Sequence, residues 1–195
     1  MIWSISFFAV VCACYLLREL SVVKGAAADL LKDFVDVSPA VILLPFCGFK
    51  PTLFLMLCLI ANEFICDNIF IGAGVFAVGY VFASLFSVWG ELSLDKIYMA
   101  SVTTIAVIVP LLAVYKGELK LKIGAGIYGG LTLPFMFYAF FVTWNPGFLA
   151  LAIGDALLLV GEMLKGNKAV RIVSDCFYFL GTCFVPLSLM GCWII

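Results

Sequence analysis

The chain has 195 residues, of which 66% are hydrophobic and 12% charged, with a formal net charge of −1 and a mean hydropathy of +1.24. A soluble domain is roughly 45–50% apolar and about 25% charged, and a water-facing fold of this size cannot bury so much apolar surface. The composition therefore excludes a soluble globular protein. We expect an integral membrane protein with no nucleic-acid partner.

Apolar runs long enough to cross a bilayer recur along the chain between clusters of charged residues. Because backbone groups in lipid must pair within their own segment, and strand-like alternation is absent, these runs predict helices. We predict an all-α bundle of about eight transmembrane helices that forms one domain over residues 1–195. The spans lie near 2–17, 36–49, 51–66, 69–89, 97–115, 123–143, 147–163 and 172–194.

The basic residues are distributed unequally between alternate connections of these spans. The first, fifth and seventh connections hold three each, whereas the opposite side has only Lys50 and Lys96. Since positive charge stays cytoplasmic, this asymmetry predicts that both termini are extracytoplasmic. No Lys or Arg precedes residues 2–17, so we interpret that run as an uncleaved helix rather than a signal peptide. The membrane would be the endoplasmic reticulum in a eukaryote or the inner membrane in a bacterium.

Several kinds of site are excluded or disfavoured by the residues present. Histidine is absent, which removes Ser-His-Asp triads and histidine-bound zinc, and the eight cysteines contain no C-x-x-C pair. We expect neither a metal nor another cofactor. Gly124, Gly126 and Gly129 match G-x-G-x-x-G but follow no strand, so close helix packing through Gly126 and Gly130 is the better interpretation.

Two carboxylates lie inside predicted spans, Asp155 in the seventh and Glu63 in the third. A charged side chain at membrane depth is costly and often marks a catalytic or transport site. Asp155 has the stronger functional case because it lies near the middle of its span, whereas Glu63 can equally be a residue that reaches water. Asp67, Glu162 and Asp175 lie near span ends, where solvated interfacial charges are the simpler interpretation. Asp67 and Asp175 are nevertheless kept as candidate partners for the two carboxylates, together with Asn62, Tyr80, Tyr138 and Tyr178.

Two segments resemble signatures of the YhhN family of membrane lysoplasmalogenases, and together they cover about a third of the chain. CLIANEFICDNIFIGAGVFAVGYVFASLFS (58–87) is similar to a signature with Asp late in one apolar helix and G-x-x-x-F-x-x-x-His-x-x-Tyr in the next. LALAIGDALLLVGEMLKGNKAVRIVSDCFYFLGTCFVPLS (149–188) is similar to a second signature. That signature has Asp in mid-helix, a short basic loop ending in Arg, and a helix containing Tyr-Tyr-x-Ala-Gln.

The resemblance places family residues on particular positions of this chain. Asp155 falls on the second family Asp, Arg171 on the loop Arg and Tyr178 on the first aromatic of the Tyr-Tyr pair. Glu63 falls on the first Asp, with Asp67 as the alternative if the gap is placed differently.

The chain departs from the family pattern at three positions. Tyr80 stands where the family usually has His, Phe82 or Phe86 replaces the following Tyr, and Thr182 stands where Gln is usual. The loss of His bears on activity more than on fold.

The resemblance implies cleavage of the vinyl-ether bond of a lysophospholipid held within the bilayer, giving a fatty aldehyde and a glycerophospho-base. Two carboxylates can perform such chemistry, one as acid and one as base or cation stabiliser. Burial disfavours a charge, so we expect Asp155 to be the protonated acid and Glu63 the ionised partner. Arg171, Lys168 and Lys165 would hold the lipid phosphate.

Two other classes of protein remain open. A small-solute or ion carrier would also place carboxylates at mid-depth, and prolines that could kink the helices are present. A non-catalytic member of the same fold is the second alternative, and Tyr80 in place of His is its best support.

Overall fold

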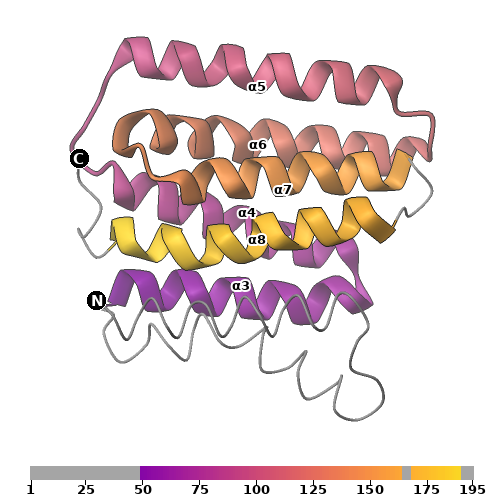
Figure 1. The fold of residues 1–195 in the computed structure, drawn as a ribbon, viewed down its shortest axis with the longest axis horizontal. Helices are drawn as coiled ribbons and strands as arrows, with labels where there is room; N and C mark the ends of the chain where they lie inside the picture. Colours follow the sequence, from indigo (N-terminus) through magenta and orange to yellow (C-terminus); the bar gives the residue numbers. More distant parts are fainter. Residues whose placement is uncertain (1–48, 164–167, 190–195) are drawn as a thin grey trace. The chain divides into compact units, whose positions relative to one another are not determined.

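The computed structural model describes residues 49–163 and 168–189, and these form helices and connections without any strand. Contacts divide the chain into two units, Met1–Phe46 and Cys47–Ile195, and every described residue belongs to the second. The helices are α3 (Phe49–Asp67), α4 (Ile69–Ser87), α5 (Leu94–Val114), α6 (Leu119–Thr143), α7 (Pro146–Met163) and α8 (Lys168–Leu189) (Figure 1). The all-α prediction is thus confirmed for the described residues.

Four of these helices are long and apolar enough to cross a membrane, over Phe70–Ser87, Leu94–Val114, Leu119–Thr143 and Ala169–Pro186. Helices α3 and α7 carry shorter apolar stretches, Phe49–Cys58 and Pro146–Gly161. The protein is therefore embedded in a membrane through its helices. Predicted span 2–17 and nearly all of span 36–49 lie outside the described residues, so the count of eight remains a prediction.

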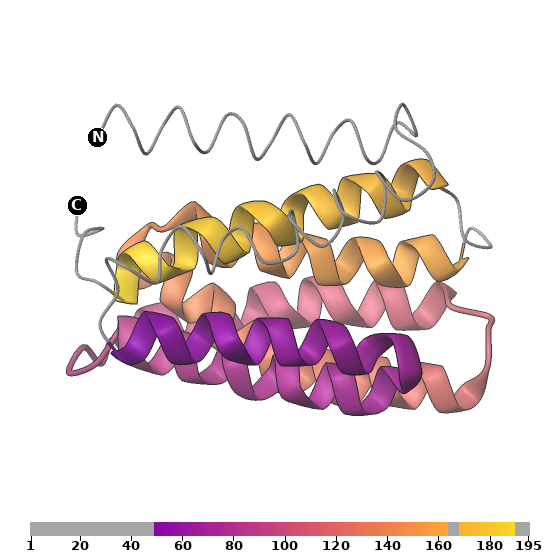
Figure 2. The same cartoon turned by 90° about the horizontal axis from the view of Figure 1, so that it is seen from below.

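Helices α3 to α7 are joined in order by short connections that lie at alternate ends, as Figures 1 and 2 show. Two contacts between helix ends fix this alternation. Lys120 Nζ lies 4.7 Å from the Phe70 ring centroid, which places the starts of α4 and α6 together. Lys50 Nζ lies 4.8 Å from the Phe86 ring centroid, which places the start of α3 beside the end of α4. The α3–α4 and α5–α6 connections therefore lie at one end, together with the last residues of α7 and the first residues of α8 (Figure 1). We call it the basic end, because Lys116, Lys120 and Lys122 lie there.

Polar side chains define where several helices begin. Asn68 caps α4 by accepting hydrogen bonds from the backbone N–H groups of Phe70 and Ile71, at 3.1 and 3.4 Å. Ser93 caps α5, so this helix begins at Leu94 rather than at residue 97, where the apolar run starts. A side-chain oxygen at this position satisfies backbone donors that the helix itself cannot pair.

The turn between α6 and α7 is fixed by a fully buried asparagine. Trp144 ends α6 in the left-handed conformation, with φ 53°. Asn145 follows it, accepts a hydrogen bond from the backbone N–H of Gly147 at 2.7 Å, and donates one to the carbonyl of Phe184 at 2.8 Å. This side chain therefore caps α7 and joins the turn to α8.

Helices α7 and α8 approach closely because glycines face the partner helix. A Cβ at Gly181 would lie 2.4 Å from Leu151 Cδ2, and one at Gly154 would lie 3.3 Å from Tyr178 Cδ2. Ser174 is also fully buried here and donates to the carbonyl of Gly154 at 3.0 Å. Small residues allow helix backbones to approach in a membrane, where packing replaces the hydrophobic effect as the driving force.

The predicted packing through Gly126 and Gly130 is correct only in part. A Cβ at Gly126 would lie 3.2 Å from Leu112 of α5, but one at Gly130 would meet nothing within 4 Å. The second close approach to α5 is at Gly129 instead, since a Cβ added there would lie 2.4 Å from Ile108 Cδ1. The helical rotation of 100° per residue places Gly129, rather than Gly130, toward α5.

Candidate functional site

Asp155 lies at the centre of the site, as the tenth of the 18 residues of α7. The hydroxyl of Tyr128 on α6 donates a hydrogen bond to Asp155 Oδ1 at 3.2 Å. The hydroxyl of Tyr178 on α8 donates to the same oxygen. The second oxygen, Oδ2, is buried and has no hydrogen-bond partner among the described residues. Three helices therefore meet at one carboxyl group, and half of that group is left unpaired.

This pattern of hydrogen bonds has a consequence for the proton of Asp155. In the neutral acid, Oδ1 is the carbonyl oxygen, since it accepts from both phenols, and the proton resides on Oδ2. Both partners are neutral groups, and an unpaired charge in an apolar medium is costly. The arrangement thus suits a neutral carboxylic acid that presents its proton away from the tyrosines.

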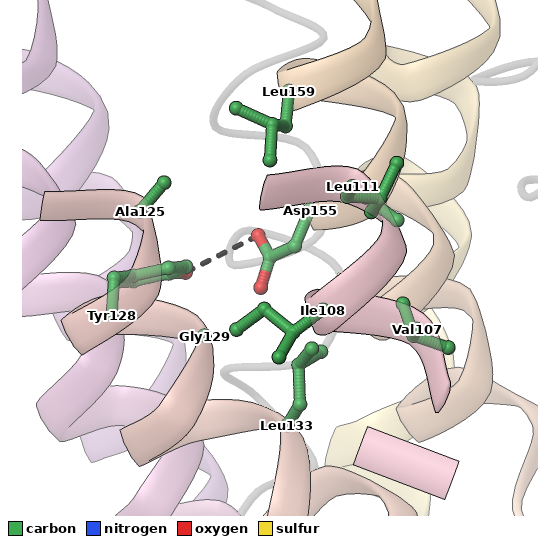
Figure 3. A pocket seen from close by; sticks show the side chains of 10 residues that line it. Val107, Ile108, Leu111, Ala125, Tyr128, Gly129, Leu133, Asp155 and Leu159 are labelled. Carbon is green, nitrogen blue, oxygen red and sulfur yellow. Dashed lines mark hydrogen bonds between the residues drawn. The ribbon is translucent and has the colours of Figure 1, made fainter. Parts of the chain in front are cut away.

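A pocket of about 50 Å³ adjoins the carboxyl group between α5, α6 and α7. Figure 3 shows Asp155 and Tyr128 pointing toward one another among apolar side chains. These two are the polar side chains of the lining, and the rest are small or apolar: Val107, Ile108, Leu111, Ala125, Gly129, Leu133, Ala156 and Leu159. The pocket suits a short length of hydrocarbon or a few water molecules next to the acid.

Tyr80 lies on α4, fully buried, close to this group. Its ring centroid is 5.5 Å from that of Phe76, which in turn stacks on Tyr178 at 6.1 Å. The Tyr80 hydroxyl lies within electrostatic range of Asp155, Tyr128 and Tyr178, yet it forms no hydrogen bond within the described residues. Of the predicted site residues, the structure therefore brings Asp155, Tyr178 and Tyr80 together.

Tyr138 is placed elsewhere, near the end of the bundle opposite the basic end. Its hydroxyl donates to the carbonyl of Glu91 at 2.8 Å and accepts from the backbone N–H of Ser93 at 3.2 Å. These bonds anchor the α4–α5 connection to α6. Tyr138 thus has a structural role at this position and is not a partner of Asp155.

The remaining predicted residues lie toward the basic end or outside the described residues. Asp175 is half-buried on α8 and interacts electrostatically with Tyr178, whereas Arg171 is exposed one turn earlier. Lys165 lies outside the described residues. For five others the structure gives the position in a helix but not the side chain: Asn62, Glu63 and Asp67 in α3, Glu162 in α7 and Lys168 in α8. A shared cavity for Glu63 and Asp155 accordingly stays a prediction.

Tyr128 belongs to the site but is not among the residues predicted from the sequence. It lies within the glycine-rich segment GAGIYGG, whose glycines predict only close helix packing. A phenol in the middle of a membrane-depth helix usually needs a hydrogen-bond partner. This requirement is the feature of the sequence that could have pointed to Tyr128 as a site residue. A carboxyl group in another helix was the natural candidate for the partner.

The fold and the site together define a helical membrane protein with a carboxyl group buried between tyrosines. No group of three or more Cys, Asp or Glu placed to hold a metal ion occurs among the residues the structure describes. The chain matches no protein-family model, no curated protein and no solved structure.

Proposed function

We propose that this protein is an intramembrane hydrolase similar to the YhhN lysoplasmalogenases, acting on the vinyl-ether bond of lysoplasmalogens. One observation carries the proposal. Asp155 has one oxygen held by two phenols and the other buried, unpaired and beside an apolar pocket. A neutral acid in such a place is suited to delivering a proton to a carbon atom of a lipid.

The reaction begins when Asp155 Oδ2 gives its proton to the vinyl carbon that does not bear oxygen. The π electrons form the new C–H bond, and the oxygen-bearing carbon becomes an oxocarbenium ion. Water then adds to that carbon and loses a proton, and the hemiacetal collapses to a fatty aldehyde and the alcohol of the glycerophospho-base. Tyr128 and Tyr178 support this step because hydrogen bonds to a charged acceptor are stronger than those to a neutral one.

Glu63 is the proposed ionised partner, which would steady the oxocarbenium ion or activate the water. In glycosidases a pair of carboxylates divides the same two tasks. Glu63 lies four residues before the end of α3, a helix that contacts both α4 and α8. Helix α3 therefore lies beside the two helices that carry Tyr80 and Tyr178, which supports a role for Glu63 in this site.

The substrate would lie with its single chain between helices and its phosphate at the basic end. Lys165, Lys168 and Arg171 are the proposed phosphate ligands, from the connection and first turn between α7 and α8. In the proposed topology, eight spans cross the membrane, both termini are extracytoplasmic and the basic end is cytoplasmic. No metal or other cofactor takes part in the proposed chemistry.

The test is an assay of purified full-length protein in lipid nanodiscs with three lysolipids: a vinyl ether, its saturated ether and an acyl ester. We expect aldehyde only from the vinyl ether, with turnover unaffected by a chelator. General acid–base catalysis contributes about 10²–10⁴-fold, so Asp155→Asn and Glu63→Gln should each lower the rate by at least that range. Asp95→Asn, in the exposed first turn of α5, and Glu162→Gln should leave it near the parent value.

Two outcomes would contradict the proposal. The first is an Asp155→Asn variant that retains the parent rate. The second is a folded protein that cleaves none of the three lipids, which would favour a carrier or a non-catalytic member of the fold. A carrier would then require Asp155 for solute uptake into proteoliposomes, and a non-catalytic protein would not.

A further inference from the structure

Three hydroxyl groups on one face of α4 lie inside the bundle without hydrogen-bond partners. They belong to Tyr80, Ser84 and Ser87, and each oxygen is buried and unpaired within the described residues. Tyr80 is 0% exposed and Ser84 is 1% exposed. Buried polar groups are nearly always hydrogen-bonded in native proteins, to the protein or to ordered water. Three buried hydroxyls without partners on one face of a helix therefore require an explanation.

The two serines differ from other hydroxyl side chains in these helices. A serine or threonine in a helix can satisfy itself by donating to the carbonyl four residues earlier. Thr104, Thr132 and Thr143 do so at 2.7–2.9 Å, and Ser101 and Thr103 behave in the same way. Ser84 and Ser87 do not form this bond. Their hydroxyls are therefore available to another partner.

The spacing of the three groups fits bridging water. Residues at i, i+4 and i+7 share one helical face, and the rise per residue separates their Cα atoms by about 6 Å and about 4.5 Å along the axis. The hydroxyls of Ser84 and Ser87 lie close to the helix, so one water molecule, which bonds two oxygens at about 2.8 Å from each and spans roughly 5.5 Å, can bridge them. The Tyr80 hydroxyl lies at the far end of its ring, so more than one water molecule is needed to reach it from Ser84. We infer that Tyr80, Ser84 and Ser87 hold a file of water molecules along the inner face of α4.

The two ends of this file give it a direction. Tyr80 is the inner end, within electrostatic reach of Asp155 and Tyr178. Ser87 is the last residue of α4, immediately before the connection in which Glu91 and Ser93 bond to Tyr138. The file therefore runs from the end of the bundle opposite the basic end toward the buried acid, as far as Tyr80, whose ring lies beside that of Phe76, which stacks on Tyr178. If the proposed hydrolysis is correct, this file supplies the water that the reaction consumes.

X-ray radiolysis tests the inference, because it forms hydroxyl radicals wherever water lies and so modifies buried side chains only beside bound water. The experiment uses the full-length protein in nanodiscs, without substrate, and measures the modification by mass spectrometry. Tyr80 and Phe148 are both 0% exposed and both aromatic, so Phe148 is the matched dry control. We expect Tyr80 to be modified several-fold faster than Phe148.

The second part of the experiment repeats the measurement after the serine hydroxyls are removed. Ser84→Ala combined with Ser87→Ala should abolish most of the modification at Tyr80. Thr104→Ala, which removes a buried hydroxyl that already bonds its own helix, should leave it unchanged. Tyr80 protected to the same degree as Phe148 in the parent protein would overturn the inference, and so would undiminished modification of Tyr80 in the double variant.

This readout is independent of turnover, so the two proposals can fail separately. Rapid modification of Tyr80 in a protein that cleaves no lysolipid would leave the water file standing and contradict the hydrolase. A protected Tyr80 in an active enzyme would remove the file and retain the hydrolase, and the water would then have to enter by another route.

Discussion

Tyr178 and Asp155 meet across the α7–α8 interface, where the phenol of one donates a hydrogen bond to Oδ1 of the other. The contact depends on Gly154, since a Cβ there would lie only 3.3 Å from the Tyr178 ring. The Tyr178 ring also stacks on Phe76 of α4. Residues from three helices thus determine where the acid can point, and each can be changed separately.

Replacing Tyr178 with Phe keeps the ring and removes one donor to Asp155. Hydrogen bonds between helices in membranes contribute about 0.6 kcal/mol on average, so the free energy of unfolding should fall by about that amount. Loss of one donor to a charge that forms during reaction costs about 10²-fold or more in rate, so activity should fall much further than stability. Lysolipid cleavage and thermal unfolding in nanodiscs measure the two effects.

The controls for this prediction use two other tyrosines. Tyr128→Phe should act in the same direction, because its hydroxyl bonds the same oxygen at 3.2 Å. Tyr98→Phe, on the exposed face of α5, should be neutral. Parent activity in both the Tyr178→Phe and Tyr128→Phe variants would show that the phenols do not support the acid.

A set of three glycine substitutions tests the packing. Gly181→Ala should destabilise the protein by about 1–3 kcal/mol, because its Cβ would overlap Leu151 at 2.4 Å. In Gly154→Ala, the new Cβ would lie 3.3 Å from the Tyr178 ring, so this variant should disturb the site more than the fold. In Gly130→Ala, the new Cβ would meet nothing within 4 Å, so the free energy of unfolding should rise by up to about 1 kcal/mol through helix propensity. Unfolding temperatures that ranked Gly130→Ala below Gly181→Ala would contradict these assignments.

The Asn145 side chain performs two tasks that substitutions can separate. Asn145→Ala removes both the cap on Gly147 and the donor to Phe184, and should cost about 1 kcal/mol or more in unfolding free energy. Asn145→Ser keeps an oxygen that can cap α7 but loses the amide donor. We expect the serine variant to lie between alanine and the parent in thermal stability, and equal losses in the two variants would mean that the cap contributes nothing.

The orientation in the membrane can be tested with single cysteines in a background without the native ones. Glu118→Cys lies in the α5–α6 connection at the basic end, and Glu91→Cys lies at the opposite end. Since positive charge favours the cytoplasm, an impermeant reagent should label Glu118→Cys from the cytoplasmic side and Glu91→Cys from outside. Cysteines added at the termini should be labelled only from outside, and cytoplasmic labelling of either terminus would contradict the eight-span topology.

Apolar composition and the length of the apolar segments determine the class of this protein. A chain with a mean hydropathy of +1.24 must place its apolar surface in lipid, and in lipid the backbone must pair within helices. The same physics singled out Asp155, because an ionisable group in mid-helix is costly wherever the helix lies. These conclusions depend on composition along the chain and not on which helices are neighbours.

The tertiary structure decided what surrounds the carboxyl group. Tyr128, Tyr178 and Tyr138 are all phenols in apolar helices, and no local pattern distinguishes the two that reach Asp155 from the one that bonds the α4–α5 connection. That distinction depends on which helical faces meet and at what depth. Close packing through glycines such as Gly154 sets both, and a contact between helices is a property of two segments that neither segment carries by itself.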